Sequence, residues 1–168
     1  MKTRLLNISC IIAMICMFGI TLNAQKRDVP ILNYGVGPVI AGSIEASALP
    51  DSARKFINEH FAGVPIVKCQ KEFSSSEYDV EFSDGVEIEF NAKGDWIEIE
   101  SGNFSTLKPS IIKAVIPATA YLWLEEQKVT NLVESIKHGK SGYKVELEGV
   151  EFDDYRFNET GKLLSISD

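Results

Sequence analysis

Cysteine is scarce in this chain of 168 residues, which contains only Cys10, Cys16 and Cys69. The first two lie in an apolar N-terminal run, so the remainder of the chain holds a single cysteine and cannot form an internal disulfide. We therefore expect its stability to come from a hydrophobic core, which a chain of this size can build. The apolar surroundings of Cys69 predict a small buried side chain rather than a nucleophile.

The chain also lacks the residue patterns that mark common enzymes. Histidine occurs only at His60 and His138, and no Gly-x-Ser-x-Gly, His-Glu-x-x-His, Cys-x-x-Cys or glycine-rich phosphate loop is present. The serines at 74–76 have no histidine nearby in the sequence, and acidic residues are too numerous for one glycosidase-like pair to stand out. We expect no enzymatic activity, no catalytic residue and no cofactor.

Basic residues are outnumbered by acidic ones, 17 to 24, and the formal net charge is −7. A nucleic-acid-binding protein would show a basic patch, so we expect no nucleic-acid partner. The acidic excess is concentrated in residues 72–100, where Lys93 is the one basic residue. No twelve-residue loop with alternating oxygen ligands and a closing glutamate occurs, and we expect no metal site.

The N-terminus has the layout of a secretory signal peptide. Lys2 and Arg4 provide a basic start, an apolar run extends to about Ile20, and Ala24 is a small residue suited to cleavage. We predict a signal peptide over residues 1–24, cleaved after Ala24, and a periplasmic or secreted mature protein. The alternative is an uncleaved anchor, because the apolar run is nearly long enough to span a bilayer, and this is the one membrane association that we consider.

A repeated pattern runs through the rest of the chain. The segment FNAKGDWIEIE beginning at Phe90 matches FNETGKLLSIS beginning at Phe157, an offset of 67 residues. The same offset pairs Pro50 with Pro117, and each proline precedes a helical pattern of apolar residues. The common order of these matches predicts an internal duplication.

Each repeated unit reads as one helix followed by four strands, which predicts an α+β fold. We expect a tandem duplication of a helix plus four-stranded antiparallel sheet, with helices on one face and an open sheet face on the other. The first α-β4 unit covers 48–104 and the second 105–168. Residues 25–47 fit neither unit and are expected to form an irregular N-terminal lead-in that partly covers a sheet edge or stays mobile.

Local signals place the individual elements. The first helix begins at Leu49-Pro50 and stops before Gly63, the second covers Ala118–Lys128, and Pro109–Val115 forms a short additional helix. His138, beside Gly139, is expected in a turn. Strands are expected at 66–72, 78–82, 86–90, 96–100, 132–137, 143–147, 150–157 and 163–167.

Side-chain alternation along these strands predicts an open acidic sheet face, because successive side chains point to opposite faces. The candidate binding residues on this face are Trp96, Glu98, Glu100, Asp79, Glu81, Glu87 and Glu89. In the second unit the corresponding face would carry Lys144, Glu146, Asp154, Arg156, Leu163, Ser165 and Ser167. Two interpretations remain open: the face is merely solvated, as in many one-sided sheets, or it docks a cationic or mixed partner with Trp96 as an anchor.

With these motifs in place, the sequence resembles the PepSY-like family of secreted proteins from Bacteroides-type bacteria, also described as beta-lactamase-inhibitor-like. The resemblance rests on ALPDSARKFINEHFAG at 48–63, YDVEFSDGVEIEFNAKGDWIEIE at 78–100 and YKVELEGVEFDDYRFNETGKLLSIS at 143–167. It implies a tandem α-β4 fold with a curved sheet surface. Beta-lactamase inhibitor proteins grip an enzyme with such a surface, and PepSY domains are associated with protease inhibition or propeptides. No motif here matches the inhibitor's contact residues, so inhibition is an analogy.

These observations together predict a non-enzymatic, inhibitor-like periplasmic binding module. It would dock a protein or peptide on its open acidic sheet face. The alternative is an envelope protein that binds a small ligand or a cation.

Overall fold

The computed structural model describes residues 43–102 and 105–168. The predicted signal peptide over 1–24 and most of the lead-in over 25–47 lie outside the described residues. In the described part of the chain, no helix is both long enough and apolar enough to cross a membrane.

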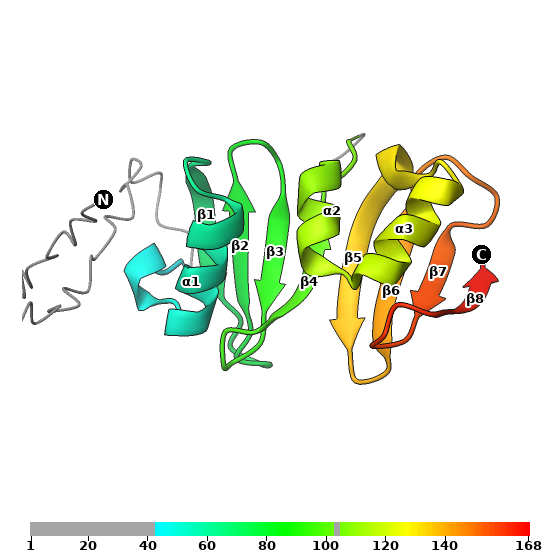
Figure 1. Ribbon diagram of the computed structural model, residues 1–168. Coiled ribbons are helices and arrows are strands. Elements are labelled where there is room, and N and C mark those ends of the chain that lie inside the picture. The colour runs from blue at the N-terminus through cyan, green and yellow to red at the C-terminus, as the bar shows by residue number, and fades with distance from the viewer. Residues whose placement is uncertain (1–42, 103–104) are drawn as a thin grey trace, which may run out of the picture. The chain divides into compact units, whose positions relative to one another are not determined.

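Eight antiparallel strands form one sheet in which the spatial order follows the chain order (Figure 1). The strands are β1 Ile66–Lys71, β2 Tyr78–Phe82, β3 Glu87–Phe90, β4 Trp96–Glu100, β5 Val133–Gly139, β6 Gly142–Leu147, β7 Asp154–Phe157 and β8 Leu163–Ser167. The predicted α+β class and antiparallel sheet are confirmed. The predicted groups of four strands are not separate sheets, because β4 pairs with β5 and places Ile99 opposite Ile136.

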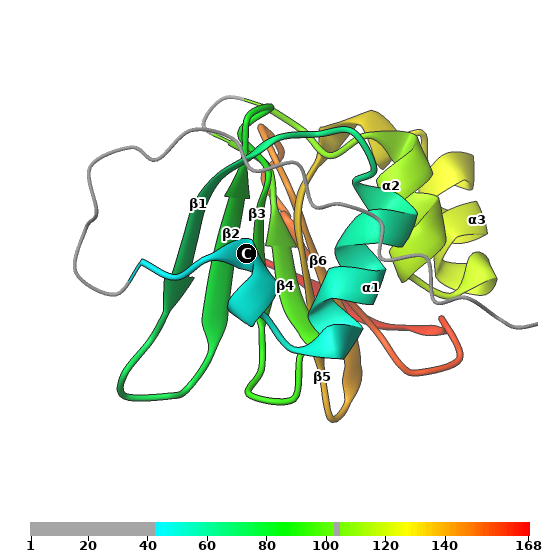
Figure 2. The same cartoon turned by 90° about the vertical axis from the view of Figure 1, so that its left-hand side faces the viewer.

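The three α-helices of the described residues lie on one face of the sheet, and none of them covers the other face (Figure 2). They are α1 Asp51–His60, α2 Pro109–Val115 and α3 Ala118–Glu126, and short 3-10 turns occupy Ala46–Ala48 (η1) and Thr130–Leu132 (η2). Proline stands at the N-cap of both α1 and α3, at Pro50 and Pro117, where its missing N–H removes no helical hydrogen bond. The additional helix at 109–115 has the predicted bounds.

The hydrophobic core lies between the helices and the sheet. On the sheet side of the core, one row of cross-strand partners runs across all eight strands: Cys69, Val80, Ile88, Ile99, Ile136, Val145, Tyr155 and Ile166. The six residues from Cys69 to Val145 are buried, whereas Ile166 on the last strand is exposed. Burial therefore declines toward the β8 edge of the sheet.

The repeated Phe-Asn-x-x-Gly segments form two turns with the same internal hydrogen bonds. The Asn91 side-chain oxygen accepts the backbone N–H groups of Lys93 at 2.8 Å and Asp95 at 3.1 Å. The Asn158 oxygen accepts those of Thr160 at 3.0 Å and Lys162 at 2.9 Å. These bonds explain why asparagine follows the last buried phenylalanine of the strand in both halves.

A β-bulge interrupts the strand pair after each turn. Glu89 lies opposite Glu98, but the next residue, Phe90, lies opposite Trp96, so β4 carries one extra residue at this point. The β7–β8 pair has the same irregularity, which places Phe157 opposite Leu163. An extra residue moves the following side chains to the other face of the sheet.

Several boundaries differ from the predicted ones, most of them by one or two residues. Strand β7 begins at Asp154 rather than Val150, and α3 ends at Glu126, two residues before Lys128 adopts a left-handed φ of 60°. His138, predicted in a turn, lies in β5, because that strand continues to Gly139 before the chain reverses. The lead-in reaches the sheet at one described point, where the Ile44 N–H donates to the Cys69 carbonyl at 2.9 Å.

Candidate functional site

Strand pairing brings six of the seven predicted binding residues together on the helix-free face. They form two rows that cross β2, β3 and β4: Asp79–Glu89–Glu98 and Glu81–Glu87–Glu100. Side chains directly opposite one another on an antiparallel pair have Cβ atoms about 5 Å apart. We call these six carboxylates the acidic face.

Neighbouring carboxylates on the acidic face repel one another. Partial burial, followed by the charge of Glu98 and then of Asp79, raises the pKa of the Glu89 carboxyl. Burial and the nearby Glu72 raise the pKa of Asp79, and burial and Glu98 raise that of Glu100. Ionisation of these three carboxylates is therefore harder than in water, because burial and neighbouring negative charges outweigh the opposite effect of Lys68 on Asp79 and of Lys137 on Glu89 and Glu100.

A basic strip borders the acidic face on the second half of the sheet. Lys137 lies opposite Glu98, and its Nζ is 2.9 Å from the Glu98 Oε1. That hydrogen bond raises the pKa of Lys137 above its usual value. The same row continues to Lys144 and Arg156, so three carboxylates are followed by three cations across six strands.

On the second half of the open face, carboxylates are paired with neighbouring lysines, unlike most carboxylates of the first half. The Lys144 Nζ is 2.7 Å from the Asp154 Oδ1 and also contacts Glu146. Burial by itself raises the pKa of Glu146, but hydrogen bonds from Lys144 and Ser135 lower it on balance. The uncompensated negative charge therefore belongs to β2, β3 and β4.

Trp96 does not lie on the acidic face, and its predicted placement there is wrong. The bulge in β4 puts it opposite the fully buried Phe90, on the helix-covered side of the sheet. Its ring centroid is 6.1 Å from that of Phe56 in α1 and 5.2 Å from that of His138 in β5. Leu163, also predicted on the open face, is displaced to the helix side by the matching bulge.

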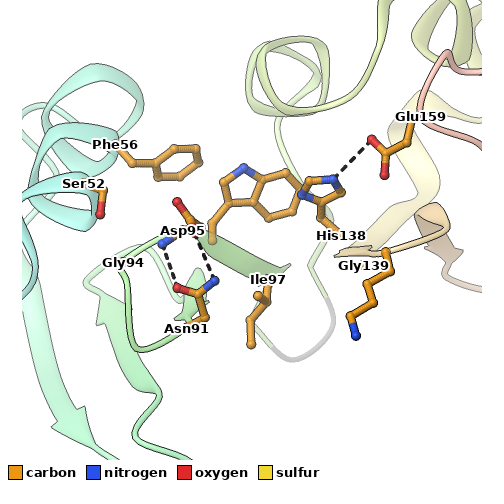
Figure 3. Close-up of a pocket in the computed structure, with 11 residues that line it drawn as sticks. Ser52, Phe56, Asn91, Gly94, Asp95, Ile97, His138, Gly139 and Glu159 are labelled. Carbon is orange, nitrogen blue, oxygen red and sulfur yellow. Dashed lines mark hydrogen bonds and ion pairs between the residues drawn. The ribbon is translucent and has the colours of Figure 1, made fainter.

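Trp96 instead contributes to a groove of about 770 Å³ that lies where α1, two turns and the β5–β6 hairpin meet. We call it the aromatic groove. Figure 3 shows Phe56 and His138 on either side of it, with Glu159 beside His138. The His138 Nε2 is 3.5 Å from a Glu159 carboxylate oxygen, and the His138 ring stacks on Tyr143 at 4.5 Å.

Sequence reasoning missed the aromatic groove. His138 and Glu159 are distant from Phe56 in the sequence and come together only because β4 pairs with β5. The pattern Trp96-Ile97 was the available signal, since two large apolar residues in succession at the start of a strand can mark a bulge. The groove offers aromatic surfaces together with the carboxylates of Asp95 and Glu159.

The remaining candidates for nucleophilic or metal-binding chemistry among the described residues are Cys69, the histidines and the clustered carboxylates. Burial, and then the charges of Asp79 and Glu45, raise the pKa of the Cys69 thiol to about 12, so the reactive thiolate is scarce at neutral pH. His60 packs against Phe56 with ring centroids 4.6 Å apart. Over 43–102 and 105–168, no group of three or more His, Cys, Asp or Glu side chains is placed to hold a metal ion.

The fold is similar to those of solved Bacteroides proteins that are described as periplasmic. A "putative periplasmic protein of unknown function" from Bacteroides vulgatus is 29% identical, with a TM-score of 0.58 over 74% of this chain and 95% of its own. A "putative calcium-regulated periplasmic protein" from Bacteroides thetaiotaomicron is 26% identical, with a TM-score of 0.62 over 76% and 96%. A further Bacteroides vulgatus protein, 24% identical over 75% and 95%, shares the fold with a TM-score of 0.60.

No curated protein matches the chain. The family described as "Putative beta-lactamase-inhibitor-like, PepSY-like" matches residues 76–165, which is more than half of the chain and includes strands β2 to β7. The matched range contains all six carboxylates of the acidic face and both bulges. The chain therefore belongs to the PepSY-like, beta-lactamase-inhibitor-like family.

Proposed function

We propose that this protein is a non-enzymatic, inhibitor-like binding module that docks a basic protein or peptide on its acidic face. The observation that carries the proposal is the pair of like-charged rows on β2, β3 and β4. A partner with lysine or arginine side chains would replace repulsion between carboxylates with attraction. Clustered charge of one sign also steers a partner of opposite charge toward the surface.

A purely solvated face accounts for these rows less well. A one-sided sheet needs polar side chains toward water, but threonine, serine, lysine and glutamate in alternation would serve equally. Like charges directly opposite one another destabilise a strand pair. The second half of the same face also places Glu146 opposite Asp154, but there the Lys144 ammonium contacts both carboxylates and offsets their repulsion.

We further propose that the protein acts in the periplasm or outside the cell after cleavage behind Ala24. Its basic start and apolar run support export. The structural neighbours from Bacteroides vulgatus and Bacteroides thetaiotaomicron are described as periplasmic. Sequencing the N-terminus of the protein recovered from the periplasm tests this, and a protein that starts at Met1 contradicts it.

We also infer that the two halves arose by duplication. Pairs of strand partners recur at an offset of 67 residues: Glu87 with Glu100, and Asp154 with Ser167. The bulge recurs at the same offset. The two copies would then have diverged on the open face, where one carries uncompensated carboxylates and the other compensated charges.

Charge reversal tests the docking proposal. We would immobilise the protein, expose it to an envelope extract of a Bacteroides species, and compare it with a Glu87→Lys/Glu89→Lys variant. Each new lysine lies between two carboxylates, so the variant is expected to fold at least as stably. We expect it to lose the basic proteins that the original chain retains at low salt.

The matched control changes the same charge on helices α1 and α3, as Glu59→Lys/Glu126→Lys. Both of these side chains are exposed, and the control is expected to retain the same proteins as the original chain. Equal retention by the face variant and the original chain would overturn docking on the acidic face.

A small ligand or a cation is the alternative occupant. It is favoured by the aromatic groove and by the Bacteroides thetaiotaomicron neighbour described as calcium-regulated. Millimolar calcium would then raise the melting temperature, because a ligand that binds only the folded state stabilises it. Loss of the shift in Asp95→Asn would assign the cation to the groove, and loss in Glu89→Gln would assign it to the acidic face. No shift in calcium would end this alternative for a calcium ion.

A further inference from the structure

The two edges of the sheet are protected to different degrees. Strand β1 carries Lys68 and Lys71, and Ser43 forms a bridge with Gln70 on its outer side. Strand β8 reads Leu-Leu-Ser-Ile-Ser and contains neither a charged residue nor a proline. Among the described strands it has no neighbour on its outer side, at the end of the sheet opposite β1 (Figure 1). An uncharged edge of this kind is a template for pairing with another strand.

Strand β4 in the first half is the counterpart of β8, and it has a further strand beside it. Strand β4 has the same pairing and bulge as β8, and Ile99 occupies the position that Ile166 occupies in β8. Ile99 is 0% exposed because β5 continues the sheet beside it, whereas Ile166 is 44% exposed and Leu164 is 59% exposed. By analogy with β5 beside β4, one further strand next to β8 would bury these two side chains.

We propose that β8 pairs with β8 of a second copy of this chain, as antiparallel strands related by a two-fold axis perpendicular to the sheet. This operation keeps the helices of both copies on one side and both acidic faces on the other. A two-fold axis uses the same surface twice, so the edge must be complementary to itself.

The sequence of β8 meets that condition in the register centred on Ser165. Ile166 then lies opposite the partner's Leu164, which covers the two exposed apolar side chains with each other. Asp168 carries a negative charge just after β8 and Lys162 a positive charge just before the bulge, so opposite charges approach each other at each end of the pair. Ser165 and Ser167 on the open face add no charge, and the acidic face lies on β2, β3 and β4, remote from this edge.

Measurement of mass in solution tests the pairing. Sedimentation equilibrium of the original chain from micromolar to millimolar concentration is expected to show a dimer. A Leu164→Lys/Ile166→Lys variant is expected to be a monomer, because four lysines would meet across the axis. Both side chains are exposed, so folding is not at risk, and Val67→Lys at the opposite edge, where the side chain is 58% exposed, is the control that stays dimeric.

The register has its own test. Asp168→Lys brings a lysine close to the partner's Lys162 and is expected to weaken dimerisation at least tenfold. Combining it with Lys162→Asp restores the opposite charges and is expected to restore the dimer. Hydrogen exchange of the β8 amides should be slow in the dimer and at least tenfold faster in the Leu164→Lys/Ile166→Lys monomer. A chain that is monomeric at all concentrations, or a dimer that Val67→Lys dissociates, would overturn the proposal.

Discussion

Glu89 illustrates how one side chain on the acidic face affects both binding and stability. It lies between Asp79 on β2 and Glu98 on β4, and burial together with these charges raises its pKa in the folded protein. A raised pKa means that the ionised carboxylate disfavours the folded state. The cost is present above the folded-state pKa and disappears below the pKa of the unfolded chain, where both states are protonated.

Replacing Glu89 by glutamine is therefore expected to stabilise the protein at neutral pH. The gain should be about 0.5 kcal/mol, the scale of one cross-strand pair, as measured by urea unfolding at pH 7. It should vanish below about pH 4, where an ordinary glutamate is protonated. Glu126→Gln on the exposed surface of α3 serves as the control with little effect at either pH. A Glu89→Gln variant that is less stable at pH 7 would contradict the repulsion on which the docking proposal rests.

Cys69 should be inert in the folded protein because its thiol is buried and has a pKa of about 12. We expect iodoacetamide at pH 7.5 to leave the peptide that contains Cys69 unmodified, and to modify it fully after denaturation in guanidinium. Mass spectrometry of the peptides distinguishes this cysteine from Cys10 and Cys16. Rapid modification of Cys69 in the folded chain would show that the thiolate is accessible after all.

At the scale of elements, each half is held together by a turn that abuts the N-terminus of a helix. A Cβ atom added at Gly94 would lie 2.6 Å from the Pro50 Cβ and 2.9 Å from the Ala53 nitrogen. At Gly161 it would lie 2.9 Å from the Pro117 Cβ and 2.7 Å from the Ala120 nitrogen. The repeat of proline and glycine in the sequence thus reflects one contact that is used twice.

Gly94→Ala is expected to destabilise the protein more than Gly63→Ala. Both glycines have a left-handed φ, 83° and 82°, so alanine should cost about 1 kcal/mol in backbone strain at either position. A Cβ atom at Gly63 meets nothing within 4 Å, whereas at Gly94 it also collides with α1, which should add about 1 to 3 kcal/mol. Chemical denaturation measures both losses. Equal losses would mean that the turn does not rest on the helix.

Side-chain alternation along single strands correctly predicted which carboxylates lie on the open face, but it failed for residues next to a β-bulge. It located Asp79, Glu81, Glu87, Glu89, Glu98 and Glu100, because the pairing is regular where these residues lie. It failed at Trp96 and Leu163, because a bulge inserts one residue and reverses the face of what lies beyond it. Alternation alone does not reveal an insertion that depends on the partner strand.

At the scale of the whole molecule, the junction of β4 and β5 joins two repeated halves into one folding unit. Ile99 and Ile136 are cross-strand partners there, and both are fully buried. The sheet and the core therefore continue from one half to the other. We expect the halves to unfold together rather than in two steps.

The two tryptophans make this expectation measurable, since Trp96 lies in the first half and Trp123 in the second. In a Trp123→Phe variant, the fluorescence of Trp96 should change at the same denaturant concentration as the circular dichroism of the whole chain. The same coincidence is expected for Trp123 in a Trp96→Phe variant. A fluorescence transition that precedes or follows the circular dichroism in either variant would show that the halves unfold separately.

The sequence alone determined which residues form helices and strands and which family the chain resembles. Those properties depend on local propensity, on alternation and on repeated turn residues, all of which are encoded in neighbouring positions. Tertiary structure decided what depends on contacts between distant segments: the pairing of β4 with β5, the placement of Trp96 in a groove with His138 and Glu159, and the exposed edge at β8. The scarcity of cysteine agrees with this, because a core that spans both halves joins the described residues, where the single cysteine, Cys69, is free.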